Sequence, residues 1–342
     1  MRPTPHPVPA GCAATEAANC FTSSLRQLMR RHGADVQEAD LLECGDGYLF
    51  RSGLDERGFP EYAMAVEQVG LTGSERLGAK LHATPFTPQD WDARLAEVAR
   101  RHKGAVVWVN SSHLVYADVY AKRPPYLHSL LASAVNAPDA AVDVWDPLIV
   151  DRRRYECDAT LSRGQFELAI FDRVKTETHD LMGVFHSVTE VACVPRLPAQ
   201  AHLLRQAKLF LGRAEYRDAV ARYRGLCLDF LQRGGATARI AARRIFDHAN
   251  VLYVLPMLAL LRVSLLRAGA GADVMQSHQR LADHWRSVAL MALKFEATEV
   301  AAVAGRIEAK FHAIEDGTAR LWSAVVRDVR LLQADTHTGL AP

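Results

Sequence analysis

The sequence contains no CxxC pair, no uninterrupted apolar stretch long enough to cross a bilayer, no internal repeat and almost no net charge. The six cysteines are scattered, and no Cys/His spacing is typical of a zinc site, so no metal is expected. A net charge of +2 provides no concentrated basic face, which argues against a nucleic-acid partner. What remains is a chain with 49% hydrophobic and 23% charged residues, which is typical of a soluble globular protein.

The chain also lacks segments that would direct it to a membrane. Its longest apolar run, residues 251–266, is interrupted by Pro256 and Arg262 and is too short to span a bilayer. The N-terminal segment MRPTPHPVPAGC has no apolar core of the kind that signal peptides contain. We therefore expect a cytoplasmic protein with reduced thiols and no membrane contact.

The character of the sequence changes at residues 195–198, Pro-Arg-Leu-Pro. The part before this point mixes helical and strand patterns, whereas the part after it shows only helical periodicity, and 342 residues favour two domains. We predict an α+β domain with a mainly antiparallel sheet over residues 1–195. An all-α helical bundle of about five or six helices is predicted over residues 196–342.

Elements of the first domain are predicted from periodicity and turn residues. A helix that begins near Cys20 places Phe21, Leu25, Leu28 and Met29 on one face and stops at Gly33. The further predicted helices are 61–69 and 87–101, the second with Thr87 as its N-cap. The predicted strands are 105–110, 126–135, 140–147, 167–171 and 183–195, with a hairpin turn at 136–139.

Cys20 stands where a stretch of small residues meets the first predicted helix. A thiol at a helix N-terminus is easily activated as a nucleophile, although a cysteine also packs well as a small hydrophobe. A nucleophilic thiol needs a base, and the base needs an acceptor that orients it. Cys20 is therefore a candidate nucleophile if the fold supplies these partners.

The hairpin predicted around residue 136 supplies both partners. His128 lies on its first strand, and Asp143 and Asp146 lie on or just beyond its second strand, so a carboxylate can reach the imidazole ring. Pro147 should end the strand pairing directly after Asp146. Asp143 remains the alternative acid, and His113, in a polar loop after a strand, remains the alternative base or a pocket residue. A papain-like thiol site has the same order along the chain: a cysteine on a helix, then a histidine on a strand, then an aspartate at the end of the next strand.

Three segments carry a resemblance to a known family: NCFTSSLRQLMRRHG, CGDGYLF with Gly45, Gly47 and Phe50, and HSLLASAVNAPDAAVDVWDP. They resemble the N-terminal domain of the butirosin biosynthesis protein H family, which is similar to the papain-like (C39-peptidase-like) domains of bacteriocin-processing transporters. The resemblance covers roughly residues 10–195, and the helices that follow are similar in character to that family's C-terminal region. It implies a papain-like α+β domain in which Cys20 is the nucleophile, His128 the base and Asp146 the orienting acid.

The resemblance also implies a reaction. An acyl group presented as a thioester on the phosphopantetheine arm of an acyl or peptidyl carrier protein would move to Cys20 and then to a small-molecule amine, forming an amide in natural-product biosynthesis. No other cofactor and no metal is implied. The papain-like pattern places a glutamine six residues before the cysteine, where this chain has Ala14. The oxyanion is therefore expected to bind the Cys20 backbone N–H with help from Asn19 or Thr22, and Gly45 and Gly47 are expected to line the acyl pocket.

Two other functions fit the same residues. The same triad acting with water or an internal nucleophile would make a hydrolase, a cysteine peptidase or a chain-releasing cyclase, because the acceptor is selected by the pocket and not by the triad. A non-catalytic accessory protein that binds a carrier protein is the second alternative, and a His128 distant from Cys20 would support it. The sequence does not indicate an oligomeric state.

Overall fold

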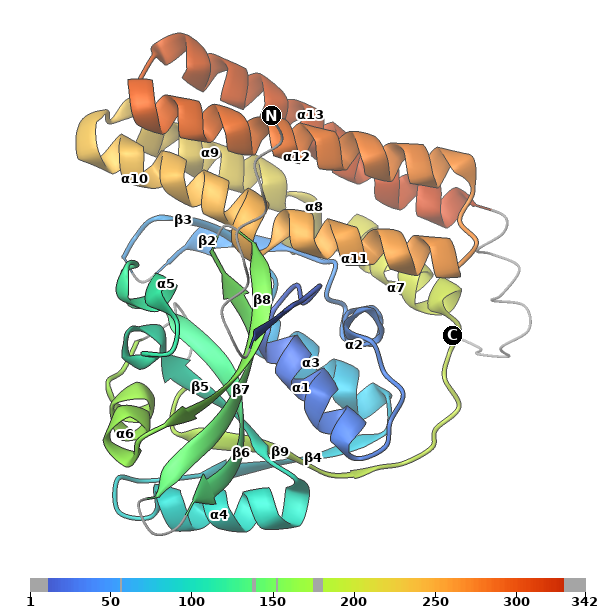
Figure 1. The fold of residues 1–342 in the computed structure, drawn as a ribbon. Coiled ribbons are helices and arrows are strands. Elements are labelled where there is room, and N and C mark those ends of the chain that lie inside the picture. The colour runs from blue at the N-terminus through green and yellow to red at the C-terminus, as the bar shows by residue number, and fades with distance from the viewer. Residues whose placement is uncertain (1–11, 56, 137–139, 152, 175–180, 329–342) are drawn as a thin grey trace, which may run out of the picture. The chain divides into compact units, whose positions relative to one another are not determined.

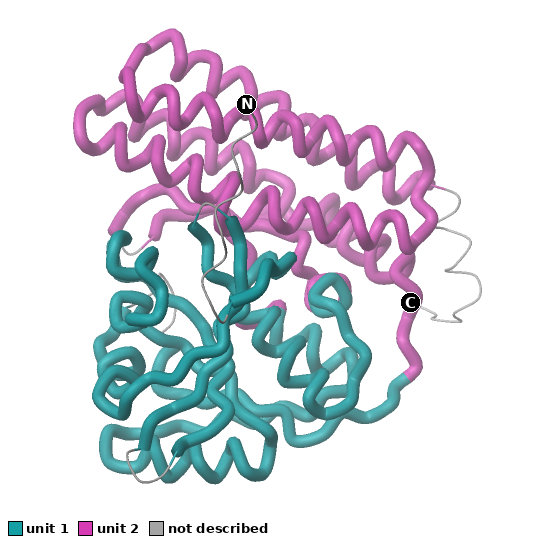
Figure 2. Tube along the Cα trace, in the orientation of Figure 1, with its two compact units in different colours: residues 1–41, 70–194 teal, residues 42–69, 195–342 magenta. Residues whose placement is uncertain are grey.

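A computed structural model describes residues 12–328 except residues 56, 137–139, 152 and 175–180 (Figure 1). The chain forms two compact units, which Figure 2 colours separately: unit 1 contains residues 1–41 and 70–194, and unit 2 contains residues 42–69 and 195–342. The boundary at 194/195 lies one residue from the expected one. Residues 42–69, which were expected in the first domain, belong to unit 2.

Unit 1 is built on a seven-stranded sheet with the order β1-β8-β7-β6-β5-β9-β4, in which every pair of neighbours is antiparallel. The predictions of an α+β class, a mainly antiparallel sheet and a C-terminal helical region are therefore confirmed. The strands are β1 (Cys12–Ala14), β4 (Ala79–Pro85), β5 (Ala105–Asn110), β6 (Leu127–Asn136), β7 (Ala141–Val150), β8 (Arg154–Leu161) and β9 (Val184–Val191).

Helices cover both faces of this sheet (Figure 1). On one face lies α1 (Cys20–Arg31), whose Phe21 ring stacks on Trp108 of β5 with centroids 4.9 Å apart. The apolar face expected for α1 is fully buried, and the helix is followed by Gly33 with φ of 88°, a conformation that favours glycine. Because side chains alternate along β5, its neighbours Val107 and Val109 point to the other face.

The other face of the sheet carries the main apolar core of unit 1. There α4 (Trp91–His102) and α6 (Arg163–Phe171) place Trp91 and Phe166 against the sheet residues, with ring centroids 5.3 Å apart. The remaining helices that contribute to this unit are α2 (Glu38–Cys44) and α3 (Val66–Arg76), which cross the unit boundaries, together with the short η1 (Ser111–His113) and α5 (Asp118–Ala121).

Several predicted elements were wrong in type or length. Residues 61–63 belong to strand β3 (Pro60–Ala63), and the helix expected over 61–69 runs instead over Val66–Arg76. The strand expected at 167–171 is the end of α6, whose N-terminus has a capping box formed by Ser162 and Gln165. The helix expected from Thr87 begins at Trp91. The hairpin turn at 137–139 lies outside the described residues.

Unit 2 is mainly helical. Its helices after residue 194 are α7 (Ala199–Gly212), α8 (Ala214–Arg217), α9 (Ala219–Gln232), α10 (Gly235–Phe246), the π-helical segment η2 (Asp247–Leu252), α11 (Val254–Arg267), α12 (Ala272–Thr298) and α13 (Ala301–Arg327). One continuous helical run, residues 235–267, is long and apolar enough to cross a membrane by composition alone, which is weak evidence because core helices of soluble proteins pass the same test.

Residues 42–69 are held within unit 2 by polar and aromatic contacts. Gln206 of α7 accepts a hydrogen bond from the Tyr48 N–H (3.1 Å) and donates to the carbonyls of Leu42 and Glu43. The segment also forms a two-stranded sheet, β2 (Arg51–Leu54) with β3. On β3, the Tyr62 ring stacks on Tyr223 of α9, with centroids 5.3 Å apart. These contacts explain why residues 42–69 belong to the same unit as the C-terminal helices and not to unit 1.

Candidate active site

Cys20 is the first residue of α1, and Asn19 is its N-cap. The Asn19 Oδ1 accepts hydrogen bonds from the N–H groups of Phe21 (2.8 Å) and Thr22 (3.2 Å), and the Asn19 carbonyl accepts one from the Ser23 N–H (3.1 Å). The first N–H groups of a helix have no acceptor within the helix. Among the described residues only the Cys20 N–H of this first turn has no acceptor, so it is the one free to bind an anion beside the thiol.

A buried carboxylate holds the loop in front of Cys20. Glu38, at the start of α2, accepts hydrogen bonds from the backbone N–H groups of Ala18 and Asn19, each at 2.9 Å, and from the Thr22 hydroxyl at 2.6 Å. Its side chain is buried. Because Glu38 contacts residues on both sides of Cys20, it fixes the direction in which the helix begins.

His128 and Asp146 form a buried pair. His128 lies on β6 opposite Val109 of β5, and Asp146 lies on the neighbouring strand β7. The distance from His128 Nε2 to Asp146 Oδ1 is 2.9 Å, and the residues are only 3% and 0% exposed. Nε2 thus faces the carboxylate, which leaves Nδ1 as the ring nitrogen that can serve the thiol.

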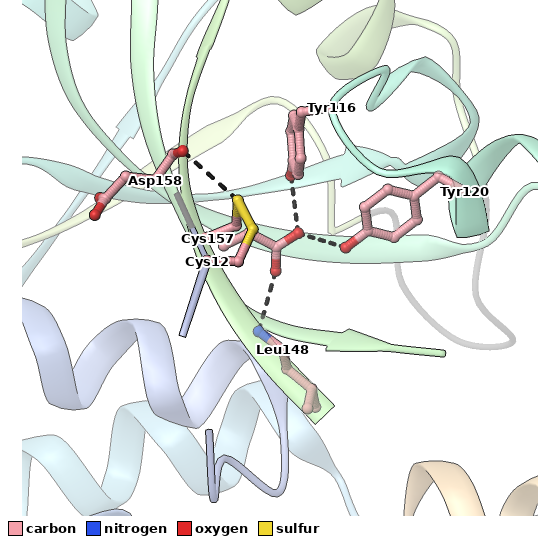
Figure 3. The surroundings of a disulfide bond; sticks show 7 residues. Cys12, Tyr116, Tyr120, Leu148, Cys157 and Asp158 are labelled. Carbon is pink, nitrogen blue, oxygen red and sulfur yellow. Dashed lines mark hydrogen bonds between the residues drawn. A yellow bond between two sulfur atoms is a disulfide. The ribbon is translucent and has the colours of Figure 1, made fainter. Parts of the chain in front are cut away.

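Asp146 receives three further hydrogen bonds. The Leu148 N–H donates to Oδ1 at 3.1 Å, the Tyr116 hydroxyl donates to Oδ2 at 2.8 Å, and the Tyr120 hydroxyl also donates to Oδ2. Figure 3 shows these three groups meeting at one carboxylate beside a disulfide. The ladder between β7 and β8 is interrupted between Asp146 and Ile149 and then resumes, so Pro147 interrupts the pairing but does not end the strand as expected.

Electrostatics couple Cys20 to this pair. Burial alone would raise the pKa of the Cys20 thiol, but the charge of His128, a hydrogen bond to the same ring and hydrogen bonds to Ser129 outweigh burial and lower it. A helix N-terminus acts in the same direction. The three predicted residues Cys20, His128 and Asp146 therefore interact within unit 1.

The pKa values of His128 and Asp146 depend on each other, and that of His128 also depends on Cys20. Burial would lower the pKa of His128, but Asp146 and Cys20 together raise it to about 10. Burial would raise the pKa of Asp146, but the charge and hydrogen bond of His128, with the donors from Tyr120 and Leu148, keep it below its usual value. Near neutral pH these directions favour a thiolate beside an imidazolium that is paired with a carboxylate.

The alternative residues have other partners. Asp143 accepts a hydrogen bond from the Thr160 hydroxyl at 2.7 Å and stands opposite Thr160 in the ladder. The distance from His113 Nε2 to Asp172 Oδ2 is 2.6 Å, and this pair is more exposed than His128 and Asp146. His113 is thus bound to a different acid, and Asp146 is the acid that contacts His128.

The residues predicted to bind the oxyanion or to line the acyl pocket have different places in the structure. Both the N–H and the hydroxyl of Thr22 are used within the helix start, by Asn19 and Glu38, so Thr22 holds the loop and is not available as an oxyanion donor. Asn19 uses its Oδ1 as the cap, which leaves its Nδ2 as a donor. Gly45 and Gly47 belong to unit 2, whereas Cys20 belongs to unit 1, and their role in an acyl pocket stays a prediction.

The expectation that all thiols are reduced is corrected by a disulfide between Cys12 and Cys157. Cys12 lies on β1 and pairs with Cys157 of β8, which in turn stands opposite Asp146 of β7. The free cysteines among the described residues are Cys20, Cys44, Cys193 and Cys227. Disulfides are rare in the cytoplasm, and the expected cytoplasmic location stays a prediction.

The sequence reasoning missed three residues that hold the site: Glu38, Tyr116 and Tyr120. In the segment SSHLVYADVY only the histidine was predicted as a site residue, although Tyr116 and Tyr120 are four residues apart, the spacing of one helical turn. No sequence signal indicated Glu38, because its contacts are made by a loop about twenty residues away in the chain.

The arrangement combines a thiol with a lowered pKa, a histidine that is hydrogen-bonded to a buried carboxylate, and a helix N–H without an acceptor, which are the kinds of group that nucleophilic catalysis uses. Over residues 12–328 with their gaps, no cluster of three or more His, Cys, Asp or Glu side chains could hold a metal ion. In comparisons with known proteins, no protein-family profile matches the chain, and no curated protein matches it.

Proposed function

We propose that this protein is a cysteine-dependent acyltransferase that takes an acyl group from a carrier-protein thioester and passes it to an amine. The observation that carries the proposal is the buried His128–Asp146 pair, with a 2.9 Å hydrogen bond, whose histidine lowers the pKa of Cys20 at the start of α1. The resemblance of residues 10–195 to the butirosin biosynthesis protein H family supports the choice of a thioester donor, and the pathway would be one of natural-product biosynthesis.

The first step forms an acyl-enzyme. The Cys20 thiolate attacks the thioester carbonyl, and the oxyanion that develops binds the Cys20 N–H, with the Asn19 Nδ2 as a second donor. The bond between the carbonyl carbon and the pantetheine sulfur then breaks, and the departing thiolate takes a proton from the His128 imidazolium. A thioester is exchanged for a thioester, so the step is nearly isoenergetic.

The second step transfers the acyl group to the acceptor. Once Cys20 is acylated, its negative charge no longer holds a proton on His128, and the neutral ring accepts a proton from the attacking amine through Nδ1. The C–S bond to Cys20 breaks, an amide forms, and the thiolate and imidazolium are restored. Asp146 keeps Nε2 protonated throughout, so that Nδ1 is the basic nitrogen.

Product analysis tests the transfer. The protein would be mixed with an acyl-pantetheine thioester and a set of small primary amines, and the amide and the free acid would be separated by liquid chromatography with mass spectrometry. We expect amide to form with the wild type and not with Cys20→Ala. Free acid as the only product, formed at the same rate with and without amine, would instead indicate the hydrolase alternative on the same three residues.

A further inference from the structure

The carboxylate of Asp146 has no contact with solvent, and its four hydrogen bonds occupy both oxygens. Oδ1 accepts from His128 Nε2–H and from the Leu148 N–H, and Oδ2 accepts from the hydroxyls of Tyr116 and Tyr120. A carboxylate offers about four lone-pair sites, so this one is fully satisfied. The buried Asp146 carboxylate cannot rotate without losing several of these four hydrogen bonds.

The hydroxyl of Tyr120 also touches the base. Its oxygen lies 3.1 Å from His128 Nε2, while its proton is used in the hydrogen bond to Asp146. A hydroxyl whose proton is committed elsewhere can only accept at this contact. Nε2 therefore faces two acceptors, the Asp146 carboxylate and the Tyr120 oxygen, and must itself carry the hydrogen.

We propose that Tyr116 and Tyr120 are positioning residues of the acyl-transfer site: their protons lock Oδ2 of Asp146, and the Tyr120 oxygen joins Oδ1 in fixing the His128 tautomer that presents Nδ1 to Cys20. This inference rests on the proposed function for its link to catalysis. The tyrosines touch neither the thiol nor the acyl group, and they act through Asp146 and His128.

The two phenols are suited to this task because they keep their protons. Burial and the nearby Asp146 charge raise the pKa of both Tyr116 and Tyr120 well above the ordinary value, so they remain donors over the whole working range of pH. Their rings also support each other at a centroid distance of 5.9 Å in an edge-to-face arrangement.

A third tyrosine provides a matched control. The Tyr126 ring lies 6.2 Å from the Tyr120 ring and 6.1 Å from the His128 ring, but no hydrogen bond joins its hydroxyl to Asp146 among the described residues. Tyr126→Phe therefore removes a hydroxyl from the same neighbourhood without removing a donor to the carboxylate.

The test compares Tyr116→Phe, Tyr120→Phe, the double variant and Tyr126→Phe. The first readout is the ¹⁵N NMR spectrum of His128 at the alkaline end of its titration, in a Cys20→Ala background, which reports the tautomer without any acyl donor. The second is the rate of Cys20 acylation by an acyl-pantetheine thioester. Thermal unfolding checks that each variant folds.

We expect the parent spectrum to show Nε2–H alone and the double variant to show a mixture of tautomers. Acylation should slow about 10-fold for each hydroxyl removed, as is common when a group that orients a functional side chain is lost, and by less than about 2-fold in Tyr126→Phe. An unchanged tautomer in the folded double variant would overturn the inference, and so would an equal loss in Tyr126→Phe. Altered tautomers in a protein that accepts no thioester would uphold the inference and reject the proposed function.

Discussion

Asp143 and Asp146 lie three residues apart on the same strand, and their partners differ. Asp146 is buried and contacts His128, whereas Asp143 contacts the hydroxyl of Thr160. Side chains three residues apart on a regular strand point to opposite faces, so only one of the two can share a face with the histidine. The choice between them, which the sequence left open, follows from this geometry.

Asp146→Asn should keep the fold and slow acyl-enzyme formation strongly, because an amide no longer fixes the His128 tautomer. In a well-studied triad the corresponding change costs about 10⁴ in rate. Asp143→Asn should change the rate by less than about 2-fold, since it removes an exposed hydrogen bond. Acylation would be timed by mass spectrometry with melting curves as the folding control, and a slow Asp143→Asn beside a normal Asp146→Asn would reject the assignment.

The reactivity of Cys20 should depend on His128. The pKa of Cys20 is lowered by His128 although burial opposes this, so the thiolate should persist to a lower pH than in an ordinary thiol of pKa 9.0. In His128→Ala burial is opposed only by the Ser129 hydrogen bonds and the helix N-terminus, and the pKa should rise to the ordinary value or above. The thiolate fraction at pH 7 then falls to about 1% or less, so alkylation of Cys20 by iodoacetamide should slow by about 100-fold.

The control for this measurement is the exposed Cys193, whose alkylation should be the same in both proteins. Peptide mapping would separate the two sites, and the buried Cys227, whose pKa is raised, should label last. Equal alkylation rates for Cys20 in the wild type and in His128→Ala at pH 6 to 7 would show that the histidine does not activate the thiol.

At the scale of elements, β1 contains only three residues and lies at the edge of the sheet beside β8, yet it leads directly to the loop that precedes Cys20. The disulfide between Cys12 and Cys157 adds a covalent link to this weak edge. Because the linked residues are 145 positions apart, the bond restricts a large part of the unfolded chain. Cys157 also stands opposite Asp146 in the ladder between β7 and β8, so loss of the disulfide should disturb the position of Asp146.

Cys12→Ser with Cys157→Ser should lower the free energy of unfolding by about 2–5 kcal/mol, and it should slow the acylation of Cys20 more than Cys193→Ser does. Urea denaturation measures the first effect and mass spectrometry the second. A thiol titration of the unfolded wild type without reductant should find four reactive thiols. Six would contradict the disulfide.

Predictions from periodicity succeeded where one segment determines its own structure. Helix α1 was predicted because its apolar face and its stop at Gly33 are both local, and the Cys20, His128 and Asp146 positions followed from one helix start and one hairpin. Residues 167–171 failed because five mainly apolar residues fit a strand and a helix equally well, and the Ser162 capping box decides for the helix. Glu38 and the two tyrosines depend on tertiary contacts, which the sequence does not show.

At the scale of the whole molecule, the two units do not follow the order of the chain. The chain passes from unit 1 to unit 2 at residue 42 and returns to unit 1 at residue 70, and the residues Leu42, Tyr48, Leu49 and Tyr62 of this segment are buried. A chain cut at 194 would expose these residues, each worth roughly 1.5–3 kcal/mol of burial. Such a truncation should aggregate.

A truncation at 194 that also removes residues 42–69 should fold. A Cβ atom built on Gly73 would lie 2.3 Å from the Leu41 carbonyl oxygen, so the backbones on the two sides of the excursion are in contact. Replacing residues 42–69 by a short Gly/Ser linker in a chain that ends at 194 should therefore give a folded unit 1 with rapid alkylation of Cys20. Size-exclusion chromatography and thermal unfolding would compare it with the plain truncation. Equal aggregation of both would show that unit 1 depends on unit 2 for folding.

The central claim is that Cys20 becomes acylated by a thioester. The most direct measurement is a rapid-quench reaction of the protein with an acyl-pantetheine thioester, followed by intact-mass and peptide mass spectrometry. The account predicts one acyl group per chain, located on Cys20, absent from Cys20→Ala and formed slowly in His128→Ala. Acylation of another residue, or none in a wild-type protein whose Cys20 reacts rapidly with iodoacetamide, would contradict it.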